Sequence, residues 1–242
     1  MARAYQRYGK RRRQSPLALL KIPLFTLGVL GICAVFYVLI ANPPERRQAV
    51  PATATPVALT ETDPILGDPS APVRFFLYCD LAGPECAKFH QEIEPKLREE
   101  FIDQGKVAIV FRNTPQNRLP AALPAAHAVM CANAQGKFWE MYAHLLENQR
   151  DWRRLNAQRQ QEELSAVEQK FVEYATSLGL DTASFETCLQ QKEFEEAIKE
   201  DIADARQANA NGVYAFRINQ RRAFAGFRNY DFVRDVIQEE LK

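Results

Sequence analysis

Two cysteines close together in the chain, Cys79 and Cys86, are the residues whose type and spacing could support redox chemistry. Cys86 ends the run Gly83-Pro84-Glu85-Cys86, which is typical of a helix start, with glycine before the first turn and proline at the first helical position. A helix N-terminus stabilises a thiolate, so Cys86 could act alone, or it could form a strained, short-loop disulfide with Cys79. The plainer interpretation is a small thiol buried in the core.

His90 lies one helical turn after Cys86 and could hold its thiolate as an ion pair, or it could be an ordinary helix residue near solvent. A metal site made from Cys79, Cys86 and His90 would lack a fourth ligand and a recognised spacing. We therefore expect no metal site and no cofactor. The segment 149–169 is charged and rich in glutamine, and it is predicted to be a connection or a solvated helix, with a partner surface as the less favoured role.

The first 21 residues carry seven basic side chains and no acidic one, and the uncharged stretch 22–41 follows directly. Twenty apolar residues suffice to span a bilayer, and the excess of cations places residues 1–21 in the cytoplasm. A cleaved signal peptide is the alternative, but its apolar core is usually shorter and ends at an Ala-x-Ala-like site. We predict an uncleaved transmembrane helix over 22–41, followed by a Pro/Ala/Thr-rich linker over 42–64.

The predicted exported part of the chain is acidic. Removing the seven basic residues of the tail from the 31 in the chain leaves 24 against 30 acids, a formal charge near −6. An acidic domain is a poor nucleic-acid binder, so no nucleic-acid partner is expected. The expected partners are the membrane, through 22–41, and an exported protein or envelope complex in the periplasm or outside the cell.

Hydrophobic periodicity predicts an α/β domain from residue 65 to residue 242. An apolar run of strand length is followed by a helix that Pro95 should kink, and then by a second apolar strand, which together make a right-handed βαβ unit. A long helical region and a strand hairpin come next, and a final helix closes the chain. The predicted elements are strand 73–78, helix 84–101, strand 106–111, helices within 120–209, strands 213–218 and 222–225, and helix 231–241.

Several sequence fragments occur in one order along this pattern. They are Gly67-Asp68-Pro69-Ser70-Ala71-Pro72, Asp80 with Gly83-Pro84-Glu85-Cys86 and Phe89-His90, the run 131–141, Leu178-Gly179-Leu180-Asp181 with Phe185 and Cys188, and Ile218-Asn219 with Gly226. With these fragments, residues 65–242 resemble the DsbA-like family of the thioredoxin superfamily. The resemblance implies a thioredoxin fold with an inserted helical domain at about 120–209, here preceded by one transmembrane helix.

The resemblance also implies an active site, and this chain departs from it twice. The family's nucleophilic cysteine falls at Gly83, while its resolving cysteine matches Cys86. The family's cis-proline falls at Tyr214, after Val213, where a trans bond is expected because a non-proline cis bond costs about 2.5–4 kcal/mol. The motif Gly83-Pro84-Glu85-Cys86 is therefore predicted to be a degenerate active site in which ordinary Cys-x-x-Cys oxidation does not occur.

A second cysteine pair, Cys131 and Cys188, lies in the helical insert. Some members of the resembling family carry a structural disulfide there, joining two helices, and an exported domain meets an oxidising compartment. Two separate buried thiols are the alternative. A bond closing a loop of more than fifty residues would stabilise the domain by about 4 kcal/mol in the chain-entropy model.

Two hypotheses for the function follow from these observations. The first is a redox-inactive or attenuated DsbA-like protein that binds exported proteins or an envelope complex. The second is a thiol-disulfide oxidoreductase or isomerase that acts through Cys86 alone or through Cys79 and Cys86. The missing nucleophile and proline favour the first hypothesis, and the two remaining cysteines keep the second open.

Overall fold

The computed structural model describes residues 59–60, 62–153, 160–212, 214–221 and 223–242. The predicted cytoplasmic tail, the predicted membrane span 22–41 and most of the linker lie outside these residues. Among the helices described, none has the length and apolar character that crossing a bilayer requires. The membrane anchor therefore stays a prediction from the sequence.

The strands form one mixed sheet in the order β1-β3-β2-β4-β5. β2 and β3 pair in parallel, as the predicted βαβ unit requires, and the other neighbours pair antiparallel. β1 was not predicted, because two residues show no period and only their pairing with β3 defines them as a strand. The strands are β1 Ile65–Leu66, β2 Val73–Cys79, β3 Val107–Asn113, β4 Tyr214–Ile218 and β5 Phe224–Ala225.

The helix after β2 is broken near the predicted kink. α2 spans Pro84–Glu92, α3 spans Glu94–Leu97, and a π-helical turn follows over Arg98–Ile102. Pro95 lies in the first turn of α3, where its missing N–H would have no partner within that helix. The prediction of one kinked helix to residue 101 was therefore wrong in detail, because the proline starts a new helix.

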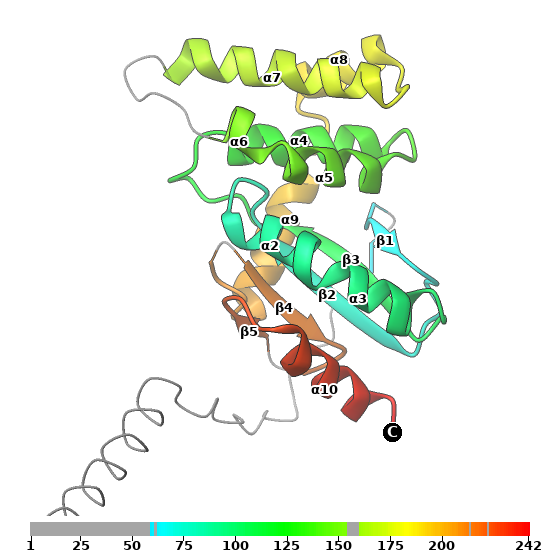
Figure 1. Cartoon of the computed structure of the whole chain (residues 1–242). Coiled ribbons are helices and arrows are strands. Elements are labelled where there is room, and N and C mark those ends of the chain that lie inside the picture. Colours follow the sequence, from blue (N-terminus) through cyan, green and yellow to red (C-terminus); the bar gives the residue numbers. More distant parts are fainter. Residues whose placement is uncertain (1–58, 61, 154–159, 213, 222) are drawn as a thin grey trace, which may run out of the picture. The chain divides into compact units, whose positions relative to one another are not determined.

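The region between β3 and β4 is helical, as predicted. Figure 1 shows α4, α5 and α6 as one layer beside the sheet, with α7 and α8 stacked on the far side of that layer. α9 differs, since it returns from the helical layers and packs along β3. The helices are α4 Ala122–Asn133, α5 Phe138–Glu147, α6 Gln149–Trp152, α7 Gln160–Ser177, α8 Thr182–Gln191, α9 Glu195–Gln207 and, after the sheet, α10 Tyr230–Glu240.

The two faces of the sheet carry different cores, because successive side chains of a strand point to opposite faces. Phe75, Leu77 and Cys79 of β2 belong to the main core, which also contains buried residues of α2 and α10. Phe76 and Tyr78 belong to a smaller core beside Ala205 of α9. Cys79 therefore lies on the face that α2 covers, and this alternation decides which cysteine it can meet.

Candidate functional site

Cys79 and Cys86 are joined by a disulfide, with their Cα atoms 6.0 Å apart. Cys79 is the last residue of β2, and its side chain lies on the same face of the sheet as Phe75 and Leu77. Cys86 lies in the first turn of α2, which packs on that face. Of the alternatives left open by the sequence, the structure contains the short-loop disulfide and not an isolated Cys86 thiol.

The disulfide is buried at the degenerate motif. Cys79 is 1% exposed and Cys86 is fully buried. Gly83 is the N-cap of α2, with φ −77° and ψ 138°, and Pro84 opens the helix. The structure thus keeps the helix start of a redox site but places glycine where the attacking thiol would be, and it keeps both sulfurs in the core.

A side chain from the helical insert fixes this loop. The Gln149 amide of α6 donates hydrogen bonds to the backbone oxygens of Leu81 and Gly83, at 2.7 Å and 2.9 Å. Gln149 and Trp152 are both buried, so the prediction that this segment is solvated was wrong at its start. The polar composition hid this role, because a buried glutamine whose hydrogen bonds are satisfied looks like a surface residue in the sequence.

Tyr214, at the position of the family's proline, is the first residue of β4 and lies opposite Cys79 in the ladder. It is buried, and its ring centroid is 5.8 Å from that of Phe89 in α2. Burial raises the pKa of its hydroxyl well above the usual range. No peptide bond among the described residues is cis, and Val213 lies outside them. Tyr214 thus fills the core beneath the site.

Asp80 follows Cys79 directly and is fully buried. Its carboxylate accepts hydrogen bonds from the backbone N–H groups of Ala82 and Gln116, at 2.9 Å and 3.0 Å. Burial raises the pKa of Asp80 to about 6, although these bonds and the charge of Arg118 oppose that rise. No role in the site was predicted for Asp80, although an acid directly after an apolar strand was a visible signal.

Replacing Asp80 by asparagine is expected to change how stability depends on pH. A folded-state pKa of about 6, against 3.8 for an unperturbed aspartate, means that the folded state holds the proton more tightly, so stability falls as pH rises from about 4 to 6. That loss amounts to about 3 kcal/mol at pH 7 and should be absent in Asp80→Asn. Urea unfolding at pH 4, 5, 6 and 7 measures it.

Asp181→Asn is the matched control for this prediction. The exposed Asp181 accepts a hydrogen bond from the backbone N–H of Ser184 at 2.8 Å, and this bond lowers the pKa of Asp181. The control should therefore alter the pH slope in the opposite direction. Identical slopes for Asp80→Asn and the wild type would refute the assignment of a raised pKa to Asp80.

His90 is engaged by a carboxylate. Its Nδ1 lies 3.0 Å from Oε2 of Glu94, and the other oxygen of that carboxylate, Oε1, accepts a hydrogen bond from Arg98. Burial opposes protonation, but the bond and charge of Glu94 raise the pKa of His90 overall. The ion pair with a Cys86 thiolate is excluded in this state because Cys86 is in a disulfide. In the described part of the chain, no three His, Cys, Asp or Glu side chains gather in a geometry suited to a metal.

Cys131 of α4 and Cys188 of α8 are also joined, with Cα atoms 5.9 Å apart and a sequence separation of 57. Replacing both by alanine is expected to lower the free energy of unfolding by about 4 kcal/mol, because the bond restricts a long loop in the unfolded chain. Replacing Cys79 and Cys86 by alanine is the control, since their short loop predicts about 2.5 kcal/mol. Urea unfolding compares them, and equal losses would contradict the loop-length argument.

The chain is similar in sequence to known proteins. The thioredoxin family, described as "Thioredoxin", matches residues 59–239. The chain is 27% identical over 186 residues to the probable disulfide bond formation protein D of Bacillus anthracis, covering 75% of this chain and 79% of that protein. It is 31% identical over 163 residues to Na(+)/H(+) antiporter NhaA 3 of Salinispora tropica, covering 67% of this chain and only 22% of the antiporter.

A solved structure shares the fold. The crystal structure of alpha-DsbA1 from Wolbachia pipientis superposes with a TM-score of 0.63 at 22% identity, covering 76% of this chain and 92% of that one. This likeness confirms the α/β thioredoxin fold with a helical insert that the sequence predicted. The family match over residues 59–239 shows that the chain belongs to the thioredoxin superfamily, and its fold is DsbA-like.

Proposed function

We propose that this chain is a membrane-anchored, extracytoplasmic DsbA-like protein that has lost dithiol exchange and binds exported proteins or an envelope complex. One observation carries the proposal: the Cys79–Cys86 disulfide has exposures of 1% and 0%, and the N-cap of α2 is the buried Gly83 in place of a thiol. Exchange needs a thiolate to reach a sulfur atom, so a disulfide enclosed in the core is a poor substrate for it.

The proposed compartment rests on the disulfides. The described domain holds two of them, Cys79–Cys86 and Cys131–Cys188, and disulfides persist mainly in oxidising compartments outside the cytoplasm. The predicted span 22–41, with seven cations before it, would anchor the domain on that side of the membrane. The acidic charge of the exported part supports a protein partner over a nucleic acid.

An oxidoreductase that uses the Cys79–Cys86 bond is the second candidate. The bond lies at the head of α2, and buried Asp80 beside it has a pKa of about 6, which suits a proton acceptor. A substrate dithiol would reduce this bond to two thiols while becoming a disulfide itself. The relatives named disulfide bond formation protein D favour this candidate, and the burial of both sulfurs opposes it.

Insulin reduction by dithiothreitol separates the two candidates. The full chain in a non-ionic detergent should turn over at background, and Cys86→Ala should do the same. In the folded wild type, mild reduction followed by iodoacetamide should leave Cys79 and Cys86 unlabelled, while labelling after denaturation in reductant should modify all five cysteines. Turnover clearly above background that Cys86→Ala abolishes would overturn the proposal in favour of the enzyme.

A further inference from the structure

Two adjoining pockets form one groove beside the degenerate site. The first, of about 380 Å³, lies between the loop after β3 and the end of α9, and the second, of about 430 Å³, continues along the same loop. They share Pro115, Gln116, Asn117 and Ile202 as lining residues. Together they can hold a short stretch of extended polypeptide with its side chains.

The first pocket is cationic. Arg118 and Arg206 line it, both are exposed, and neither forms an ion pair with a carboxylate of the described residues. The side-chain amides of Asn117 and Asn211 add hydrogen-bond donors, and no acidic residue lines this pocket. Two unpaired guanidinium groups facing one cavity favour an anionic ligand.

A buried hydroxyl in the same pocket independently points to a ligand. Thr114 lines the pocket at 4% exposure, and its Oγ1 has no hydrogen-bond partner among the described residues. Buried polar atoms nearly always have a partner, and a bound group is one way in which the Thr114 hydroxyl can gain one. A ligand oxygen that also meets the arginines would satisfy it.

The second pocket is apolar along one side. Leu119, Leu123, Ile198 and Ile202 line it, and Leu123, at 36% exposure, is the single exposed large apolar side chain of the described residues. Glu195 is the acidic residue of this pocket, and its carboxylate already has partners. Its Oε2 lies 3.1 Å from Nε2 of His127, and its Oε1 lies 3.7 Å from Nζ of Lys199. The groove therefore changes from cationic to apolar along its length.

The groove is fixed to the degenerate site by hydrogen bonds. Gln116 donates from its backbone N–H to Asp80, and its side-chain amide donates to the oxygens of Thr114 and Gly212, at 3.0 Å and 3.1 Å. The backbone N–H of Thr114 donates to the oxygen of Cys79 at 3.0 Å. A floor held this firmly is preorganised, which lowers the entropic cost of binding.

We propose that this groove binds an acidic segment of a partner protein, with a carboxylate held by Arg118 and Arg206 and the Thr114 hydroxyl, and with neighbouring apolar side chains against Leu123 and Ile202. The assignment rests on the proposed function, because it identifies the surface through which the domain would hold an exported protein. A carboxylate and adjacent apolar side chains match the charge and the apolar lining of the two pockets.

The test uses the full chain in dodecyl maltoside and a fluorescein-labelled, capped peptide of alternating leucine and acidic residues. Fluorescence anisotropy should show binding that weakens about tenfold in Arg118→Gln and in Arg206→Gln, because each removes a charge-assisted contact. Arg74→Gln is the matched control, since Arg74 is an exposed arginine near the other end of β2 and should leave affinity unchanged. The basic residues 1–21 attract acidic peptides without specificity, and this attraction is the same in every variant. The test therefore compares the peptide affinities of the variants with one another.

Several results would overturn the assignment. They are equal binding of the same peptide with glutamine and asparagine in place of its acids, equal losses in Arg74→Gln, or no binding at millimolar peptide. Glutarate that binds as tightly as the peptide would replace the protein partner by a free dicarboxylate and overturn it too. Insulin turnover, measured on the same samples, tests the proposed function separately. Background turnover together with no peptide binding would contradict the groove assignment and leave the loss of dithiol exchange standing.

Discussion

Replacing Gly83 by cysteine and Cys79 by alanine is expected to raise insulin reduction about a hundredfold above the wild-type rate. The double variant places Cys-Pro-Glu-Cys at the head of α2, where the helix dipole lowers the pKa of a thiol at the N-cap. Gly83 has an extended backbone that any residue adopts, so the new side chain imposes no backbone strain. The wild type lacks this thiol, and opening its buried disulfide at a cost of about 3 kcal/mol would slow exchange by that hundredfold.

The control for this gain of function is Gly83→Ser with Cys79→Ala, which removes the same disulfide and adds a side chain of similar size without a thiol. It should show background turnover, and circular dichroism should show that both double variants fold. If the wild type already reduces insulin as fast as the cysteine variant, the Cys79–Cys86 bond is a working redox centre. The oxidoreductase candidate would then replace the binding protein.

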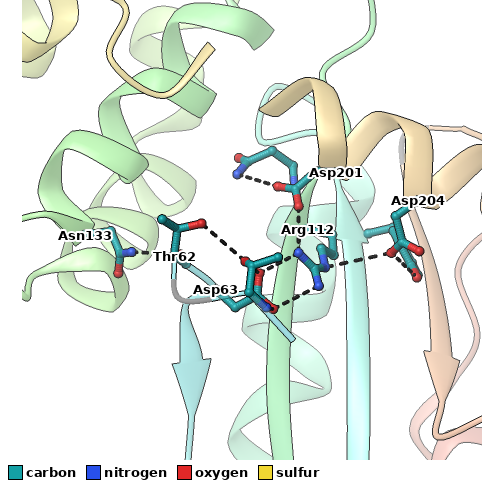
Figure 2. A network of polar contacts seen from close by, with 9 residues as sticks. Thr62, Asp63, Arg112, Asn133, Asp201 and Asp204 are labelled. Atoms are coloured by element: carbon teal, nitrogen blue, oxygen red, sulfur yellow. Dashed lines mark hydrogen bonds and ion pairs between the residues drawn. The ribbon is translucent and has the colours of Figure 1, made fainter. Parts of the chain in front are cut away.

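Replacing Arg112 by methionine is expected to lower the free energy of unfolding by about 5 kcal/mol at pH 7. Arg112 is 4% exposed, and Figure 2 shows its guanidinium among three carboxylates. Its Nη2 donates to Asp63 at 2.9 Å, its Nη1 donates to Asp201 at 3.1 Å, and its Nε lies 3.8 Å from Asp204. Removing one partner of a buried ion pair costs about 3–5 kcal/mol. Here the substitution leaves three carboxylates without the guanidinium that compensates their charge.

The free energy of unfolding that Arg112→Met loses should be smaller in acid than at pH 7. Burial raises the pKa of Asp201 to about 6 even though Arg112 lowers it, so the folded state takes up this proton more readily than the unfolded state does. Without Arg112 that pKa rises further above 6, so Asp201 of the variant takes up its proton at a higher pH than in the wild type, and by about pH 6 its uncompensated charge is removed. Urea unfolding at pH 7 and pH 4.5 should therefore show the gap from wild type narrowing on acidification.

Arg74→Met is the control for this prediction, because it removes an exposed arginine from the neighbouring strand β2 and should change stability by about 0.5 kcal/mol or less. A loss in Arg112→Met no larger than that in the control would mean that the network contributes nothing. A gap that stays constant with pH would mean that Asp201 is not the group that responds. The same network ties Asp63, at the start of the described chain, to β3 and α9.

The sequence by itself determined the parts of this protein that depend on local order. The apolar run 73–78 predicted β2, Pro84 predicted the start of α2, and the sequence from 106 to 111 predicted β3, because periodicity and helix-start residues act over a few positions. It also determined that the position of the family's nucleophilic cysteine is a glycine, Gly83, because residue identity is read directly from the sequence. The predicted span 22–41 is equally local and stays a prediction.

Only the tertiary structure decided what these parts do together. Whether Cys86 meets Cys79, and whether Gln149 closes the loop above them, depended on how α2 and α6 pack against β2, which no local period encodes. The Arg112 network joins residues about fifty and ninety positions apart. The sequence Gly83-Pro84-Glu85-Cys86 left open whether Cys86 is a reactive thiol. The packing of α2 on β2 places Cys86 in a buried disulfide, and the reactivity of a cysteine depends on its access to solvent and to partners.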